Sequence, residues 1–321
     1  MRILVALGGN AILKPNEKGT EDEQLLNLQA TSDELAELVA RGHRISITHG
    51  NGPQVGDILL LYELAKQKLP PMPLDVCGAQ SQGMIGYLLQ QSIDNSLRRR
   101  GLDFPTVTVL TRTVVDANDP AMLAPSKPIG PFYTKKQADE LRKEKGWSVK
   151  RDSVRGYRRV VASPKPIHVV EEKMIRELFD LGFIVIHSGG GGIPVIRERD
   201  GNLRGMEAVV DKDLTAALIA ALLEVDIFLI LTDVEKVFLN YGRHDQTAID
   251  SLTASECLKY QSEGQFAQGS MAPKIEAARN FVLSSKNHQK AGMNKRSAII
   301  TSLGNALDAL DGKAGTLVSL D

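Results

Sequence analysis

Short apolar runs alternate along the chain with longer stretches in which apolar residues recur at helical spacing. Runs that are rich in Val, Ile and Leu without polar alternation are typical of strands covered on both faces. Strand and helix in alternation predict right-handed crossovers and an α/β fold, with helices on both faces of a mostly parallel sheet. The predicted strands are residues 2–7, 44–48, 106–110, 183–187, 226–231 and 297–301.

Two stretches between these runs show the 3.6-residue period of amphipathic helices. The first is residues 21–41, after which Gly42 supplies a stop because glycine adopts positive φ without steric cost. The second begins near Leu214 and is opened by Asp211-Lys212-Asp213, of which Asp211 suits a helix N-cap. The stripes consist of Leu25, Leu28, Leu35, Leu38 and Val39 in the first helix, and of Leu214, Leu218, Ala221 and Leu222 in the second.

One segment, residues 116–166, interrupts this alternation. It contains six prolines and the single tryptophan, Trp147, and it has few periodic apolar stretches. Within it, residues 134–159 include ten Lys and Arg against four Asp and Glu, a local net charge of +6. We interpret the segment as an inserted, protruding subdomain with a basic face, which could close as a lid over an anion and exclude water. A solvated helix and hairpin without such a role is the simpler alternative.

The overall charge balance excludes several classes of partner. Among 321 residues, 39 Lys and Arg offset 39 Asp and Glu, so the formal net charge is zero. A broad nucleic-acid surface or a polybasic membrane anchor needs a large field of one sign. No window approaches the roughly 20 apolar residues that span a bilayer, and the first apolar run is too short for a secretory signal. We therefore expect neither a nucleic-acid partner nor a membrane.

The two cysteines, Cys77 and Cys257, are too few for a disulfide framework, and neither has metal-ligand spacing around it. We therefore expect a reducing compartment, the cytoplasm. The length is compatible with two domains or with one large α/β core.

Three of the predicted strands end in glycine clusters. Without Cβ the backbone can take positive φ and approach an anion closely, and parallel strands bring such loops to one edge of the sheet. A single glycine pair is more often a tight turn, but three at corresponding strand ends favour a phosphate site. None matches a P-loop or a dinucleotide fingerprint. The clusters are Gly8-Gly9, then Gly50-Asn51-Gly52 before Pro53, which suits a helix start, and Gly189 to Gly192.

Two lysines stand at predicted helix starts, where a cation opposes the helix dipole. Lys212 lies between Asp211 and Asp213, and Lys274 follows Pro273, which we expect at the first helical position. Either lysine could extend its ammonium group to water. Together they suit phosphoryl transfer, whose loose transition state is stabilised mainly by positioning and by neutralisation of charge on oxygen.

The six histidines form no nucleophile or metal pattern. Only His49 adjoins a glycine loop, and we expect it to order that loop rather than act as an acid or base.

Nine short motifs occur in order along the chain, at residues 6–11, 48–56, 81–87, 127–133, 155–161, 189–194, 210–214, 231–234 and 269–274. The set resembles the carbamate kinases of the amino acid kinase superfamily. Coverage extends from the first strand to Gly315 and Thr316, which makes it far more specific than one glycine loop. Departures from the pattern are small, namely Ala272 in place of glycine, Gln80 in place of glutamate, and a longer polar loop at residues 284–295.

The resemblance implies one amino acid kinase domain over residues 1–321, a three-layer αβα sandwich with a protruding subdomain at 116–166. About 1–181 would form the carbamoyl phosphate half and 182–321 the nucleotide half. It implies reversible phosphoryl transfer between carbamoyl phosphate and ADP, giving ATP and carbamate, as the last step of arginine deiminase-type catabolism. Mg²⁺ would accompany ADP or ATP, held by nucleotide phosphates and water rather than by a protein metal site. The assembly would be a homodimer.

The resemblance also implies roles for individual residues. Lys127, Lys212 and Lys274 would act on the transferring group, with Asp213 and Asp211 holding the lysines in place. Groups that would cradle the carbamoyl and phosphoryl moieties are Gly8, Gly9, Asn10, Gly50, Asn51 and Gly52. Groups that would bind the nucleotide are Gly190, Gly191, Asp233, Tyr241 and Met271, together with Lys212 and Lys274.

Two other functions are compatible with the same residues. One is a related kinase that forms an acyl phosphate from another small carboxylate, against which the motif around Lys127 argues. The other is a nucleotide-binding sensor without turnover, against which the intact set of Lys212, Asp213 and Lys274 argues.

Overall fold

The protein is described by a computed structural model that covers residues 1–14, 17–152, 156–284 and 296–321. Its central sheet consists, within these ranges, of β1 (Arg2–Leu7), β2 (Arg44–His49), β3 (Thr106–Thr108), β9 (Ile184–Ile186), β12 (Ile227–Thr232), β15 (Ser251–Thr253), β16 (Ser297–Ser302) and β17 (Thr316–Ser319). The spatial order is β15-β17-β16-β12-β1-β2-β9-β3. Neighbouring strands are parallel except β16 and β17.

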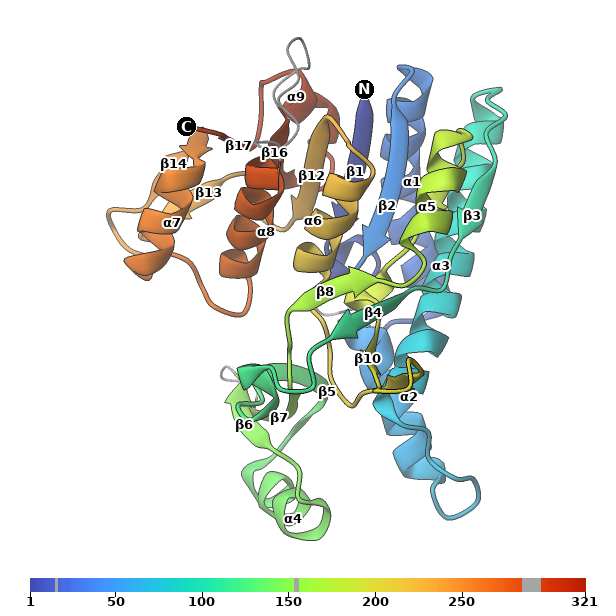
Figure 1. Ribbon diagram of the computed structural model, residues 1–321, viewed down its shortest axis with the longest axis vertical. Helices are drawn as coiled ribbons and strands as arrows, with labels where there is room; N and C mark the ends of the chain where they lie inside the picture. Colours follow the sequence, from blue (N-terminus) through green and yellow to red (C-terminus); the bar gives the residue numbers. More distant parts are fainter. Residues whose placement is uncertain (15–16, 153–155, 285–295) are drawn as a thin grey trace.

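Helices cover both faces of this sheet (Figure 1). Strand β1 shows why its sequence is apolar throughout, because successive side chains of a strand point to opposite faces. Ile3, Val5 and Leu7 pack on one side, and Leu4 and Ala6 on the other, all fully buried. The first side is covered by α1 (Glu21–Ala40), α3 (Leu74–Arg99) and α9 (Ala306–Leu310), the second by α5 (Glu172–Asp180), α6 (Lys212–Leu222), α7 (Ala254–Ser262) and α8 (Met271–Ser284). The predicted three-layer αβα fold is confirmed.

The six predicted strands are β1, β2, β3, β9, β12 and β16, with ends that differ by at most two residues. Helix α1 begins after Thr20, whose side chain forms a capping box with Glu23. It ends at Ala40, and Gly42 adopts a φ of +80° as expected for a glycine stop. Continuous apolar runs and a glycine stop were therefore sufficient to place these elements.

The predicted stripe of α6 is right in part, because Leu214, Ala221 and Leu222 pack against the core but are only partly buried. The buried face carries Thr215, Ala216, Ile219 and Ala220, whereas Leu218 is 38% exposed. Small side chains let α6 approach the sheet and α8 closely, so the alanines occupy the interior and the larger leucines lie toward its rim. Leu218 is therefore the one predicted stripe position that lies outside the core.

A second sheet lies beyond the carboxyl ends of the central strands, in the order β11-β10-β4-β8. A three-stranded sheet, β5-β7-β6, projects from the body together with α4, beside α2 (Figure 1). The bounds are β4 (Arg112–Val115), β8 (Pro166–Val169), β10 (Ile193–Arg197), β11 (Leu203–Gly205), β5 (Lys127–Tyr133), β6 (Val149–Asp152), β7 (Gly156–Val161), α2 (Gly52–Ala65), α4 (Lys135–Lys145), and a hairpin of β13 (Val237–Leu239) and β14 (Thr247–Ile249).

Several of the basic side chains that give residues 134–159 their positive charge have acidic partners. Lys145 pairs with Glu63 of α2, Arg159 pairs with Glu207 at 2.5 Å, and Arg142 pairs with Asp139 at 2.6 Å. The charge excess therefore serves partly to attach the projecting sheet to the body.

Within the described ranges, none of the helices is both long and apolar enough to cross a membrane. Residues 285–295 of the polar loop that departs from the family pattern lie outside the described residues.

Candidate active site

Three loops meet where β1, β2 and β9 end. Parallel strands place their carboxyl ends at one edge of a sheet, and Leu7 pairs with His49 in register there. A Cβ on Gly50 would lie 3.2 Å from the Gly9 nitrogen, so the first two loops touch through bare backbone. The third loop, around the 3₁₀ turn η3 (Gly189–Gly191), joins them from β9. The predicted convergence of the glycine clusters is confirmed.

A cavity opens over these loops, which we term the central cavity. Helices α2, α6 and α8 begin at its wall, so the positive ends of three helix dipoles are directed toward it. Pro53 lies in the first turn of α2, as predicted. The lining of the central cavity includes Gly9, Gly50, Asn51, Gly52, Lys127, Gly190, Asp211, Lys212, Asp213, Gly269, Ser270 and Lys274.

Helix α8 starts two residues earlier than predicted. Its first residue is Met271, so Pro273 is the third helical position rather than the first. Proline is accommodated there because the first four N–H groups of a helix have no intrahelical acceptor. The earlier start places Lys274 just beyond the first turn, still at the cavity wall.

Asp213 joins the two lysines of the helix starts. Its Oδ1 accepts from Lys212 Nζ at 2.5 Å, and its Oδ2 accepts from Lys274 Nζ at 3.0 Å. Asp211 caps α6 by accepting from the Asp213 backbone N–H at 3.0 Å, and its other oxygen accepts from Lys127 Nζ at 2.8 Å. Three ammonium groups from β5, α6 and α8 are thereby held by two carboxylates.

Burial and charge act in opposite directions on these groups. Burial alone would raise the pKa of Asp213, but Lys212 and Lys274 outweigh it and hold that pKa well below its usual range. Burial lowers the pKa of Lys212 despite the attraction of Asp213, and the charge of Lys274 lowers it further. For Lys274 the attraction of Asp213 outweighs burial, so its pKa is raised. An added anion would complete the charge balance of a site that already holds more lysines than aspartates.

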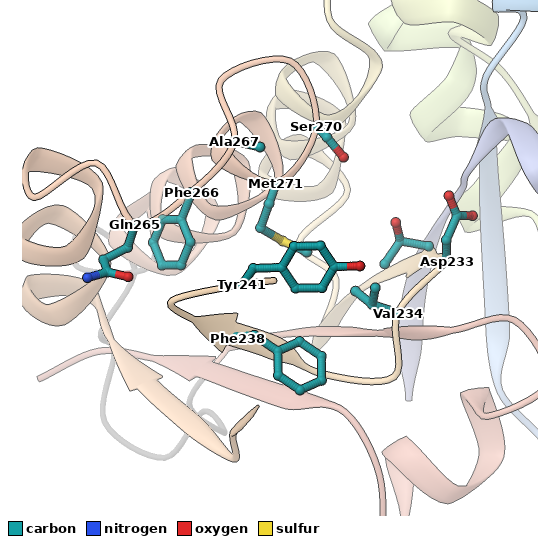
Figure 2. A pocket seen from close by; sticks show the side chains of 10 residues that line it. Asp233, Val234, Phe238, Tyr241, Gln265, Phe266, Ala267, Ser270 and Met271 are labelled. Carbon is teal, nitrogen blue, oxygen red and sulfur yellow. The ribbon is translucent and has the colours of Figure 1, made fainter. Parts of the chain in front are cut away.

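A second cavity, the aromatic cavity, adjoins the first and shares Ser270 with it. Figure 2 shows Tyr241 between Phe238 and Met271, with Asp233 at the far end. The rings of Phe238 and Tyr241 lie 5.9 Å apart at 49°. Aromatic faces and a thioether make a suitable surface for a flat heterocycle. The lining is Thr232, Asp233, Val234, Phe238, Tyr241, Gln265, Phe266, Ala267, Ser270 and Met271.

Three of the predicted site residues lie outside both cavities. The Gly8 N–H is already bonded to the Leu231 carbonyl at 2.9 Å, and the Gly191 N–H to the Ser188 carbonyl at 2.9 Å, so neither faces an anion. Asn10 lines a separate groove beside α1. These glycines instead permit close backbone packing, since a Cβ on Gly191 would lie 2.4 Å from the Val210 carbonyl oxygen.

Comparison with known proteins gives a family consistent with this geometry. The model of the amino acid kinase family matches residues 1–289. Carbamate kinases of Pyrococcus horikoshii and Clostridium perfringens are both 48% identical to the chain, over 320 and 321 residues, and the alignments cover 99% of each protein. The chain belongs to the carbamate kinases of the amino acid kinase family. The resemblance of the nine motifs is confirmed.

A solved carbamate kinase structure shows the same fold. The enzyme from Giardia lamblia bound to AMP-PNP has a TM-score of 0.90 and 40% identity, with coverage of 100% of this chain and 98% of that chain. The chain therefore shares the carbamate kinase fold over its full length.

The residues that hold the third glycine loop of this carbamate kinase were not predicted. Gln82 on α3 donates to the Gly189 carbonyl at 3.1 Å, and Thr113 and Thr215 donate to the Gly191 carbonyl at 2.8 and 2.9 Å. The loop needs such ties because Ser188 has a φ of +51°, uncommon for a residue with a side chain. Motif 81–87 includes Gln82, so this signal was present in the sequence without an assigned role.

The His49 ring of this carbamate kinase contacts the second and third glycine loops. It is buried, and its Nδ1 lies 2.9 Å from the Gly50 carbonyl oxygen. Burial lowers the pKa of His49 to about 4, so the ring is neutral near pH 7. A Cβ on Gly189 would lie 2.5 Å from the ring, which therefore fills the space that this glycine leaves. The position agrees with the predicted loop-ordering role.

Proposed function

We propose that this carbamate kinase transfers a phosphoryl group reversibly between carbamoyl phosphate and ADP, giving ATP and carbamate, which decomposes to ammonia and carbon dioxide. The observation that carries the proposal is the convergence of Lys127, Lys212 and Lys274 in the central cavity, which shares Ser270 with the aromatic cavity. The central cavity holds three lysines and two aspartates and lies at three helix N-termini, and the other cavity is aromatic.

The lysines would act by neutralising charge. In phosphoryl transfer the equatorial oxygens of the moving group carry most of the negative charge, and preorganised donors stabilise it without moving protons. Lys212 and Lys274 are fixed by Asp213 before substrate arrives, so little reorganisation remains to be done. Lys127 would contact the same anion from β5, exchanging Asp211 for phosphate.

No general base is needed for this reaction. Carbamate is already an anion when it attacks and when it leaves, so neither direction requires removal of a proton from the nucleophile. His49, neutral and bonded to its own loop, takes no part in this scheme.

The nucleotide would occupy the aromatic cavity. Its base would lie against Tyr241 and Met271, and its phosphates would extend past Ser270 toward Lys274. The Giardia lamblia relative binds AMP-PNP, a nucleotide of the same class. Asp233, Gly190 and the backbone near Gly269 are the other groups we place beside the nucleotide.

Mg²⁺ would enter with the nucleotide. Among the described residues no three His, Cys, Asp or Glu side chains gather to hold a metal, and the oxygens of Asp211 and Asp213 already accept from ammonium or N–H groups. Phosphate oxygens and water would therefore hold the ion. When bound, Mg²⁺ supplies further neutralisation of phosphate charge.

We place the reaction at the end of arginine deiminase-type catabolism, in the direction of ATP. The homodimer and the cytoplasmic location stay predictions, as does the division of the chain into a carbamoyl phosphate half and a nucleotide half.

An assay of ATP formation tests the proposal. Purified protein with Mg²⁺ and ADP is expected to make ATP from carbamoyl phosphate, and Lys212→Ala is expected to lower kcat by about 10² to 10³-fold, as loss of one oxyanion donor does. The matched control is Lys173→Ala, which removes an exposed lysine on α5. Bound nucleotide without product would favour the sensor, and ATP from other acyl phosphates alone would favour the related kinase.

A further inference from the structure

Asn51 occupies the N-cap of α2 but does not cap the helix. Asparagine at this position ordinarily accepts a hydrogen bond from the second or third helical N–H, at a benefit near 1 kcal/mol. Here the side chain makes no such bond, and its Nδ2 instead donates to Ser81 Oγ at 2.8 Å. The Asn51 amide is therefore held for a purpose other than capping α2.

Ser81 fixes which end of that amide faces it. Its hydroxyl lies 2.7 Å from the Gly78 carbonyl, which can only accept, so the single O–H hydrogen is committed there. Ser81 Oγ can therefore only accept from Asn51, and the amide must present its NH₂ end. Ser81 is fully buried, so water does not offer an alternative donor or acceptor.

Gly190 holds the amide from the opposite side. A Cβ on Gly190 would lie 2.2 Å from Asn51 Oδ1 and 2.3 Å from both Cγ and Nδ2. Three nearly equal distances mean that the amide lies flat over this α-carbon. The next residue of α3 after Ser81, Gln82, donates to the neighbouring Gly189 carbonyl at 3.1 Å. Ser81 and Gln82 therefore hold the two sides of the contact between Asn51 and the third glycine loop.

The oxygen of the Asn51 amide has no hydrogen-bond donor among the described residues. Asn51 lines the central cavity, and Oδ1 accepts no hydrogen bond from any residue in the described part of the chain. Carbamoyl phosphate carries an NH₂ donor where acetyl phosphate, its near-isostere, carries a methyl group. An amide that could rotate would not keep its oxygen opposite that NH₂ donor, so the contact that distinguishes the two substrates would be weakened.

We propose that Ser81 is a positioning residue for specificity: by holding the Asn51 amide, it presents Oδ1 to the carbamoyl NH₂ and disfavours acyl phosphates that lack a donor. The inference rests on the proposed function and deepens it. Acetyl phosphate leaves Oδ1 facing a methyl group, and an unpaired buried polar atom is how sites reject analogues. Motif 81–87 thereby gains a role in substrate choice.

The test compares kcat/KM for carbamoyl phosphate and for acetyl phosphate, with ADP and Mg²⁺, in the wild type and Ser81→Ala. The wild type is expected to prefer carbamoyl phosphate. In Ser81→Ala that preference is expected to fall roughly three- to tenfold, the worth of one neutral hydrogen bond. The loss is expected mainly as a higher KM for carbamoyl phosphate, because the NH₂ contact exists before and during transfer.

Two further variants separate positioning from simple support. Ser81→Cys, whose thiol donates and accepts weakly, should give an intermediate preference and covers the case in which Ser81→Ala does not fold. Ser92→Ala removes another buried serine of α3, eleven positions along the helix, and should leave the preference unchanged.

The outcomes divide cleanly. A wild type that makes ATP from carbamoyl phosphate while Ser81→Ala and Ser81→Cys keep its preference, or lose both substrates equally, overturns the inference and leaves the proposed function standing. A wild type that makes no ATP from either acyl phosphate overturns both.

Discussion

Asp213 shows how one carboxylate organises a site built from like charges. Its side chain is 3% exposed and contacts two ammonium groups that would otherwise repel each other inside the protein. Removal of one partner from a buried ion pair usually costs about 3 to 5 kcal/mol, because the remaining charge stays buried and unpaired. Asp213 therefore stabilises the fold and the geometry of Lys212 and Lys274 by the same contacts, and its two effects cannot be mutated apart.

Two buried histidines give the protein a measurable sensitivity to acid. Burial lowers the pKa of His49 to about 4 and that of His187 to about 3. In the unfolded chain histidine binds a proton near pH 6.5. As the pH falls from about 6.5 toward 4, the unfolded state gains protons that the folded state does not, so the free energy of unfolding decreases by about 1.4 kcal/mol per pH unit for each histidine.

Urea unfolding of the wild type and His187→Gln at pH 7, 6 and 5 isolates this effect, because the carboxylates of both proteins titrate alike. The wild type is expected to lose stability relative to the variant by about 1.4 kcal/mol per unit below pH 6. A difference between the two proteins that stays constant with pH would show that His187 takes up a proton as readily in the folded state as in the unfolded chain.

At the scale of elements, glycine positions record how closely a helix approaches its neighbour. Helix α3 offers a matched pair, because Gly86 and Gly83 both lie in its interior. A Cβ on Gly86 would meet Thr108 Cγ2 of β3 at 2.3 Å, whereas a Cβ on the exposed Gly83 meets nothing within 4 Å. The same substitution should therefore have opposite signs at the two sites.

Gly83→Ala is expected to raise the free energy of unfolding by about 1 kcal/mol, the difference in helix propensity. Gly86→Ala is expected to lower it by about 1 to 3 kcal/mol, since overpacking outweighs propensity and β-branched Thr108 has no easy alternative rotamer. Denaturant midpoints of the two variants test this, and equal stabilisation by both alanines would refute the close contact between α3 and β3.

The elements also show what sequence patterns could predict. Unbroken apolar runs placed the six strands because a strand that is buried on both faces has apolar side chains at nearly every position. The centre of the buried face of α6 was missed because small residues fill its most crowded positions and the predicted residues lie at its edge. The start of α8 was missed because proline fits any of the first positions of a helix. The placement of Gly8 and Gly191 outside both cavities could not be predicted, because glycine serves close packing as well as anion binding and composition does not distinguish the two.

At the scale of the whole molecule, the projecting sheet reaches the site through a few contacts. Trp147 has the Lys145 ammonium 4.6 Å and the Arg159 guanidinium 4.3 Å from its ring centroid, and Lys145 also pairs with Glu63 of α2. Strand β5 then carries Lys127 to Asp211, at the start of α6. The distance between α2 and β5 therefore sets where Lys127 stands relative to the other two lysines.

That distance depends on two glycines. A Cβ on Gly56 of α2 would lie 2.9 Å from the Gly130 Cα of β5, so Gly56→Ala must push the strand away. Lys127 lies three residues from Gly130, and displacements near 1 Å at a reacting group can cost about 10²-fold in rate. We expect Gly56→Ala to lower kcat/KM for carbamoyl phosphate by roughly 10 to 100-fold. ADP affinity should stay within about twofold, since the aromatic cavity has no residue on α2 or β5.

Steady-state kinetics and ADP titration of Gly56→Ala provide the measurement. Gly83→Ala serves as the control, because it adds the same methyl group to a helix without touching a neighbour. An equal loss of ADP affinity and carbamoyl phosphate turnover would mean that the substitution disturbs the central sheet rather than the position of β5. Unchanged kinetics would mean that Lys127 reaches its place independently of the packing between α2 and β5, and that the projecting sheet is positioned by its ion pairs alone.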